Sequence, residues 1–142
     1  MNPRLLLHLE GAAVFGIGLV AYRWNHGGWP EFFLLFLAPD ESMFGYLVSP
    51  RVGAVTYNSV HTYVGPLALA AWSVWADRPA ALLLSLIWLA HIGLDRMLGF
   101  GLKYPTRFKD THLNPDRHAA AIADSPFGSL RQGDERALSR RR

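Results

Sequence analysis

The stretch 84–103 (LSLIWLAHIGLDRMLGFGLK) carries ionisable side chains inside an otherwise apolar run. His91 and Asp95 are four positions apart, so both lie on one face of a helix. Ionisable groups in a membrane cost a few kcal/mol each and are retained mainly where they pair, bind an ion or line a wet cavity. This pair therefore predicts a functional site. Polar residues that could complete it interrupt the other apolar stretches: Glu10, Asp40, Asn58 and His61.

Carboxylates and imidazoles from facing helices are the ligand set of metal sites in helical bundles. We expect a divalent metal ion to be bound here, with Zn, Fe or Mn suited to nitrogen and oxygen ligands. The ion would compensate the buried acids and activate a water molecule for hydrolysis. Two residues are the candidate catalytic groups, Glu10 as ligand or general base and Asp95 as a carboxylate beside the water. The predicted metal ligands are Asp40, His61, His91 and Asp95.

The same residues fit three other interpretations. They could form a proton or ion path through the membrane. They could form a polar network that only packs helices, with Asp95 bonded to Arg96 or His61 and Asn58 bonded to a backbone carbonyl. His61 and His91 could ligate a b-type haem, which we favour less because a porphyrin leaves the neighbouring acids unexplained.

Apolar residues and aromatic residues are abundant enough for an integral membrane protein, at 51% and 13% of the 142 residues. Turns rich in Gly, Pro and Asn separate four apolar stretches, each about twenty residues long, and Pro39 and Pro66 are expected to kink two of them. Small residues give the first stretch a face that a neighbouring helix can approach closely, namely Gly11, Ala12, Gly16 and Gly18. The predicted spans are 5–24, 30–48, 52–75 and 79–103.

Lys and Arg are concentrated on one side of these spans. That side holds Arg4, Arg51, Lys103 and the C-terminal segment, whereas the other side holds Arg23 and Arg78. The positive-inside rule therefore puts both termini in the cytoplasm and the protein in the cytoplasmic (inner) membrane. Counting about 1.5 Å per helical residue puts the predicted ligands in the cytoplasmic half of the bilayer.

The charge and the residue types also limit the partners. A net charge of +3, gathered in the C-terminal segment, suits anionic lipid, and we expect no nucleic-acid partner. The chain has no cysteine, which excludes disulfides, thiolate metal ligands and a cysteine nucleophile. Neither a His-Glu-x-x-His motif nor a serine elbow is present, so the site is not that of a zinc protease or a serine hydrolase of those classes.

Several polar motifs recur in one order along residues 5–113, and this order carries a resemblance. The motifs are Ala38-Pro-Asp40 with Gly45-Tyr46, Asn58-x-x-His61-x-Tyr63, His91-x-x-x-Asp95-Arg96, and Lys103-Tyr-Pro with Lys109-Asp-Thr-His112. The chain resembles a bacterial family of small four-span membrane proteins, the domain-of-unknown-function 4260 family. The resemblance implies the four-span topology and no particular activity. It adds Tyr46 and His112 to Asn58 and Arg96 as further polar members of the predicted site, with Lys109 and Asp110 beside His112.

We therefore predict an all-α fold, a transmembrane four-helix bundle over residues 1–113 with a short cytoplasmic C-terminal extension. Residues 114–142 are predicted to be a polar, basic and disordered tail. As an enzyme, the protein would carry out metal-assisted hydrolysis or redox chemistry on a lipid-soluble small molecule that enters from the bilayer. The alternatives are a small proton- or ion-coupled transporter, expected to be a homo-oligomer, and a non-catalytic membrane scaffold.

Overall fold

The computed structural model describes residues 2–104, which form an all-helical chain and confirm the predicted fold class. The predicted tail at 114–142, His112 and the motif around Lys109 lie outside the described residues. The elements are α1 (Pro3–Trp24), α2 (Trp29–Phe36), the 3-10 helix η1 (Ala38–Leu47), α3 (Pro50–Val60), α4 (Val64–Trp75) and α5 (Pro79–Leu98).

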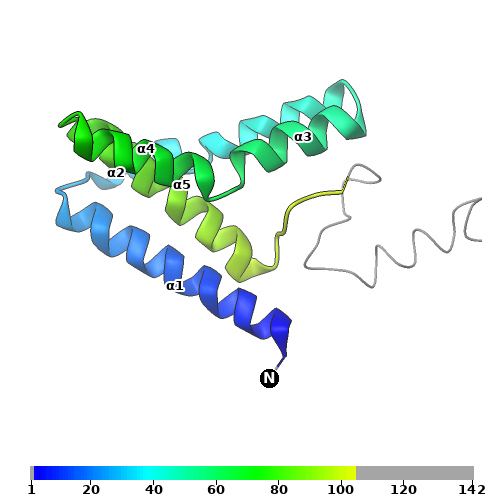
Figure 1. The fold of residues 1–142 in the computed structure, drawn as a ribbon, viewed down its shortest axis with the longest axis horizontal. Coiled ribbons are helices and arrows are strands. Elements are labelled where there is room, and N and C mark those ends of the chain that lie inside the picture. The colour runs from blue at the N-terminus through cyan, green and yellow to red at the C-terminus, as the bar shows by residue number, and fades with distance from the viewer. Residues whose placement is uncertain (1, 105–142) are drawn as a thin grey trace, which may run out of the picture.

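These elements make four antiparallel passes, which are α1, then α2 with η1, then α3 with α4, then α5 (Figure 1). Along one half of the molecule, α4 and α2 pack against α5, which also lies beside α1 along its length. Along the other half, η1 and α3 pair with each other as a hairpin and diverge from α1 and α5, so that the described chain has a forked outline. We call the pair α1 and α5 one arm of the fork and the hairpin of η1 and α3 the other arm.

The second and third passes differ from the single kinked spans expected at 30–48 and 52–75. Each is two helices with a break between them, at Leu37 in one pass and at 61–63 in the other. Proline has no N–H to donate and its ring clashes with the carbonyl four residues earlier. Pro39 therefore ends the α-helical bonding after α2, and Pro66 prevents α3 from continuing past Thr62. Both breaks fall within a few residues of a predicted ligand.

Glycines bring α1 and α5 into direct backbone contact. A Cβ placed on Gly93 would lie 2.6 Å from the backbone nitrogen of Phe15, and one on Gly11 would lie 2.5 Å from that of Met97. Gly18 faces Ala90 in the same way, whereas Gly16 has nothing within 4 Å. The small-residue face predicted for the first span is thus confirmed for Gly11 and Gly18, which α5 approaches, and is wrong for Gly16, which faces open space.

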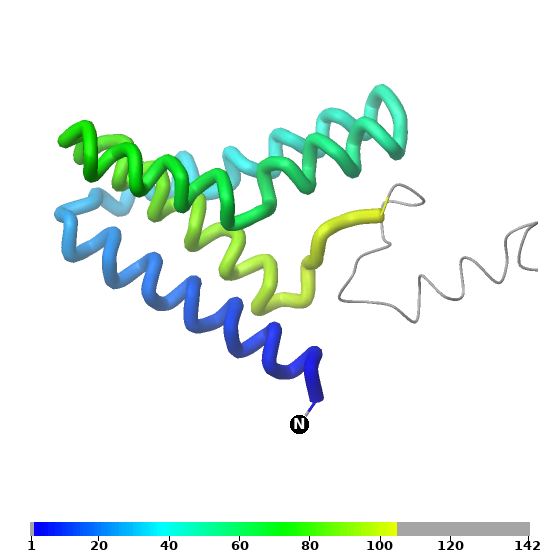
Figure 2. The backbone as a smooth tube through the Cα atoms, viewed as in Figure 1, coloured from blue at the N-terminus to red at the C-terminus, as the bar shows by residue number. Residues whose placement is uncertain are grey.

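The last helix ends earlier than the predicted 103. Gly99 adopts a left-handed conformation (φ 88°), and Phe100 N–H donates to the Asp95 carbonyl, which is the bond that closes a Schellman motif. Residues 99–104, which we call the C-terminal strap, then leave the end of α5 and turn toward α3 (Figure 2). Both hydrogen-bonding ends of the Asn58 amide hold the strap, at 2.8 Å to Lys103 O and 2.7 Å from Lys103 N–H.

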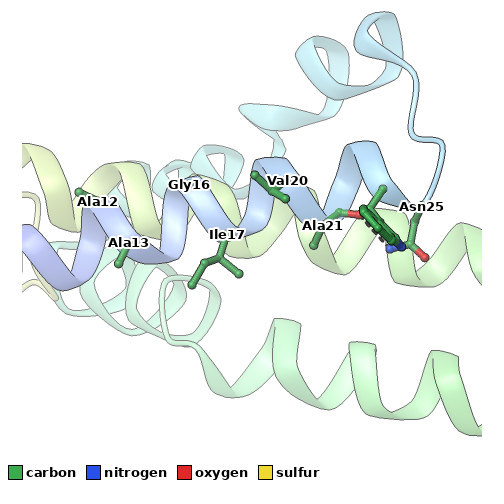
Figure 3. A pocket seen from close by; sticks show the side chains of 8 residues that line it. Ala12, Ala13, Gly16, Ile17, Val20, Ala21 and Asn25 are labelled. Atoms are coloured by element: carbon green, nitrogen blue, oxygen red, sulfur yellow. Dashed lines mark hydrogen bonds between the residues drawn. The ribbon is translucent and has the colours of Figure 1, made fainter.

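Two helices, α1 and α5, are long and apolar enough to cross a membrane, at mean hydropathies of 1.7 and 1.5. Large apolar side chains are also exposed on several elements, including Trp24, Phe33, Leu47 and Trp75, each at least 70% exposed. Figure 3 shows the outward face of α1, a shallow groove lined by Ala12, Ala13, Gly16, Ile17, Val20, Ala21, Trp24 and Asn25. So much exposed apolar surface is unusual for a soluble monomer and is typical of a chain that contacts lipid or other proteins.

Candidate metal centre

Four predicted ligands meet where the two arms of the fork join. Asp40 lies in the first turn of η1, immediately after the proline that follows the first break. His61 is the residue that ends α3, at the second break. His91 and Asp95 lie one turn apart on α5. One side-chain nitrogen or oxygen from each of the four lies within 4.8 Å of all the others.

The distances between these atoms are short and similar. His61 Nε2 lies 3.2 Å from His91 Nε2, 3.4 Å from Asp40 Oδ1 and 3.6 Å from Asp95 Oδ2. His91 Nε2 lies 3.6 Å from the Asp40 oxygen and 3.9 Å from the Asp95 oxygen. Both imidazoles are buried, Asp95 is 16% exposed and Asp40 is 38% exposed, so the cluster opens on the Asp40 side.

Tyr57, one turn before His61 on α3, orients two of the ligands. Its backbone carbonyl lies 3.0 Å from His61 Nδ1, and because a carbonyl only accepts, Nδ1 carries the proton there. In the neutral ring, Nε2 then carries no proton, and its lone pair points into the cluster. The Tyr57 hydroxyl donates to Asp95 Oδ2 at 3.1 Å, and its ring stacks on the His61 imidazole at 3.7 Å. Such outer partners are typical of metal-binding histidines and carboxylates.

The cluster has too few protons for its acceptors. His61 Nε2 and the two carboxylate oxygens are acceptors. The Tyr57 hydroxyl donates to Asp95 Oδ2, and His91 Nε2 can bring at most one more proton to the three. His91 Nδ1 is also buried and has no hydrogen-bond partner within the described chain. Buried carboxylates without a compensating charge are costly. The arrangement therefore favours a cation at its centre or additional protons.

The geometry fits a single cation. Zinc bonds of about 2.0–2.2 Å to nitrogen and oxygen in a tetrahedral arrangement place neighbouring ligand atoms about 3.3–3.6 Å apart. Five of the six separations between the ligand atoms, at 3.2 to 3.9 Å, are near the edges of such a tetrahedron, and the sixth, between the two carboxylates, lies within 4.8 Å. A haem bound between His61 and His91 would need its iron and macrocycle between the two Nε2 atoms, and 3.2 Å leaves no room for them.

A cation stands at the edge of the cluster. Lys103 Nζ lies 4.6 Å from the centre of the Tyr57 ring and 5.4 Å from the centre of the Tyr46 ring. Burial lowers the pKa of the Lys103 ammonium, an effect that the carboxylates of Asp40 and Asp95 oppose. The strap thus places one positive charge near the two acids, with its side chain over two aromatic faces.

The other predicted site residues take different positions. Glu10 is exposed on α1 and does not belong to the four-residue cluster. Asn58 binds the strap backbone, as the packing interpretation expected. Arg96 donates to the carbonyls of His61 and Phe100 at 2.9 and 2.8 Å, which ties the end of α3 to the strap. Tyr46 lies on η1 below Lys103.

Two residues near the cluster did not follow from the sequence as site members, Tyr57 and Lys103. Tyr57 is four residues before His61, so helical periodicity alone puts it on the ligand face. That spacing was the available signal. Lys103 belongs to a motif that the family resemblance singled out, but only the reversal of the chain at Gly99 brings it back to α3.

Comparison with known families identifies the family of this chain. A family model described as Domain of unknown function (DUF4260) matches residues 4–115, which include the four clustered residues and the strap. No curated protein and no solved structure matches the chain.

Proposed function

The chain belongs to the DUF4260 family, and because that description assigns no activity, we propose a function from the site: a metal-dependent membrane enzyme that acts on a lipid-soluble substrate. Its metal ion would be bound by His61, His91, Asp95 and Asp40. The observation that carries the proposal is the convergence of four ligand atoms, three of them acceptors, inside 4.8 Å. Two imidazoles and two carboxylates suit zinc, iron or manganese.

The unequal burial of the ligands supports a division of roles. His61, His91 and Asp95 are the most enclosed and form a set of two histidines and one carboxylate, which leaves coordination positions open. Asp40 is the most exposed and belongs to a ten-residue 3-10 helix, longer than such helices usually run. Asp40 would be the most weakly held of the four ligands and the carboxylate best placed to act as a general base toward water, and a bound metal would supply Lewis-acid activation of that water, so hydrolysis is the favoured reaction.

We also propose that all four passes cross the bilayer, in the inner membrane with both termini cytoplasmic. Besides α1 and α5, the two broken passes are also long enough. At about 1.5 Å per α-helical residue and about 2.0 Å per 3-10 residue, the combined helix length is about 32 Å in the second pass and about 35 Å in the third. Both sums compare with a hydrocarbon core of about 30 Å. His91 would then lie about 10 Å from the cytoplasmic end of α5.

Metal analysis of the detergent-purified protein tests the proposal. We expect about one equivalent of a divalent metal per chain, and its loss in both His61→Ala and His91→Ala. His26→Ala is the matched control. His26 is exposed in the connection between α1 and α2, outside the cluster, so its loss should leave the metal content unchanged. Wild-type protein that takes up no metal, or variants that keep it, would contradict the proposal.

A proton- or ion-coupled transporter is the second candidate, favoured by the breaks in both central passes beside the cluster. Discontinuous helices surround the ion sites of many transporters. In that case the missing charge in the cluster would be an added proton. Proteoliposomes holding the protein would then dissipate a pH gradient, and Asp95→Asn would abolish this while metal analysis found no bound ion.

A further inference from the structure

Building on the proposed function, we propose that the substrate is an uncharged acyl compound, an ester or an amide, whose hydrocarbon chain lies in an apolar pocket that ends beside the metal ligands. The carbonyl group of the substrate would then lie at the metal ion. Three features carry this proposal: the composition of the pocket, the direction in which it deepens, and the surface on which it opens.

The pocket lies between α5 and the two broken passes and has a volume of about 220 Å³. At about 30 Å³ per non-hydrogen atom, it holds a chain segment of about seven carbons, and it is too small for a helix about 10 Å wide. The indole N–H of Trp88 is the one side-chain donor among the lining residues, and it donates to the Val60 carbonyl at 2.8 Å. The walls therefore offer a ligand apolar contact alone. The lining residues are Leu35, Ala38, Pro39, Val60, Leu69, Leu84, Ile87 and Trp88.

The exposure of the lining residues gives the pocket a direction. At one end, Leu84 is 43% exposed and Leu35 is 36% exposed. At the other end, Pro39 is buried, and Ile87 is 2% exposed and belongs to the hydrophobic core. The pocket therefore runs from a mouth on the outer surface of the chain to an inner end within the helices.

The inner end is the one that adjoins the metal ligands. Pro39 immediately precedes Asp40, and Ile87 is one helical turn before His91. Long side chains on a helix lean toward the preceding turn, so the His91 imidazole is expected over the turn that holds Ile87. A chain in the pocket therefore has its inner end within about one helical turn of the ligand atoms. A carbonyl group bonded to that end is in position to reach the metal.

The mouth opens on an apolar surface. Leu34, Leu37 and Leu67 lie within two positions of lining residues along the chain, and each is at least 55% exposed. In the membrane arrangement proposed above, this surface contacts hydrocarbon, and a chain that moves from lipid into the pocket exchanges one apolar environment for another. A charged group would pay a large desolvation cost on the same route, whereas an ester or amide carbonyl would pay far less. The route therefore selects an uncharged acyl compound.

Hydrolysis of such a compound can be written with the residues of the site. The oxygen of a water molecule bonds to the carbonyl carbon, and the bond from that carbon to the ester oxygen or amide nitrogen breaks. Asp40 takes the proton from the water and passes it to the departing alcohol or amine, and the chain is released as a carboxylic acid. The site is open on the side of Asp40, which is 38% exposed, so the departing group has a way out there.

Cobalt-loaded protein in a maltoside detergent provides the test, because the visible spectrum of bound Co²⁺ responds to a ligand at the metal. The probes are acetohydroxamic acid and octanohydroxamic acid, which share an uncharged, metal-binding head group and differ only in chain length. Loading is first checked by its loss in His61→Ala. We expect octanohydroxamic acid to change the spectrum at a concentration at least about tenfold below acetohydroxamic acid.

Filling the pocket should separate the two probes. Leu69→Trp puts an indole in the path of the chain, so it should weaken octanohydroxamic acid at least about tenfold and acetohydroxamic acid by less than about twofold. Leu67→Trp, exposed on the same helix and outside the pocket, is the matched control and should weaken neither. Uptake of a probe by the micelles is the same for every variant and cancels in these comparisons. Leu84→Trp, at the exposed mouth, replaces Leu69→Trp if that variant does not fold.

The outcomes separate the two proposals. If cobalt binds in the His61-dependent way but the two probes act alike, or Leu69→Trp and Leu67→Trp have the same effect, the acyl-chain proposal is wrong and the metal site stands. If Leu69→Trp instead dissociates a dimer, as measured by light scattering, the pocket belongs to an interface between copies of this chain. If no His61-dependent cobalt binds, both proposals fail together.

Discussion

Glycine brings backbones together in both arms of the molecule, yet the arms differ in what lies at the contact. Between α1 and α5, Gly11, Gly18 and Gly93 form a seam between two unbroken helices, and the neighbouring side chains are mostly apolar. In the hairpin of η1 and α3, Gly45 and Gly53 allow a similar approach. That hairpin, however, begins and ends at a helix break, and both breaks deliver a ligand to the metal site.

The difference shows how one chain combines a rigid scaffold with a polar centre. Continuous helices satisfy their own backbone groups, so α1 and α5 need only close packing. A break exposes backbone groups that must find partners. At the second break, the His61 carbonyl accepts from Arg96 and the Val60 carbonyl accepts from Trp88, both on α5. The same contacts hold His61 against α5, where His91 and Asp95 lie.

The largest expected effect is on metal binding. Removing the charge of a buried ligand should weaken the affinity for the metal more than removing the charge of an exposed ligand. Asp95→Asn should weaken metal binding by roughly 100-fold or more, because the buried acid is enclosed and bound by Tyr57. Asp40→Asn should weaken metal binding by only about tenfold, because Asp40 is partly exposed and a water molecule can take its place as a ligand. Competition with a chromogenic chelator measures both. Equal losses would contradict the assignment of Asp40 as the most weakly held ligand.

The glycine seam should respond through stability. Gly93→Ala pushes a methyl group against the backbone nitrogen of Phe15, which cannot move away as a side chain can, so we expect a loss of about 1–3 kcal/mol in the free energy of unfolding. Gly16→Ala is the matched control, because no atom lies near its Cβ and alanine favours the helix. Denaturation in detergent compares the two. A comparable loss in both would show that the seam is not tightly packed.

A smaller effect is expected where the tyrosine hydroxyl supports the metal ligands. Tyr57→Phe keeps the ring stacked on His61 and the backbone carbonyl that binds His61 Nδ1, and removes only the hydrogen bond to Asp95. Loss of such an outer partner should weaken metal binding about tenfold, at the lower end of the usual range. The chelator competition applies again. Unchanged affinity would mean that the hydroxyl does not act on Asp95 when the metal is bound.

The smallest expected effect is local to the strap. Asn58→Ala removes two hydrogen bonds to Lys103, so the strap should open more easily, by about 1–2 kcal/mol. Faster hydrogen exchange at the Lys103 amide would report this without a change in global unfolding. Ser59→Ala, which removes a bond within α3 alone, serves as the control. The expectation fails if both variants leave exchange at Lys103 unchanged.

Much of the site could be predicted from residue types and spacing. Ionisable residues are so costly in apolar stretches that Asp40, His61, His91 and Asp95 stood out, and the structure brings these four together. The same reasoning included Glu10, which lies on an exposed face of α1. Depth along a helix follows from residue counting, but the direction in which a face points depends on which neighbour packs there.

The amino-acid sequence by itself determined that the chain is helical, where its turns fall, and which side chains are too polar for their surroundings, because periodicity, proline and burial cost are local or compositional properties. Only the tertiary structure decided that both central passes break beside the ligands, that Tyr57 orients two of them, and that Lys103 returns to the site. These features depend on contacts between segments 30 to 50 residues apart, as in the pairs His61–His91 and Asn58–Lys103, and no local pattern encodes which segments meet.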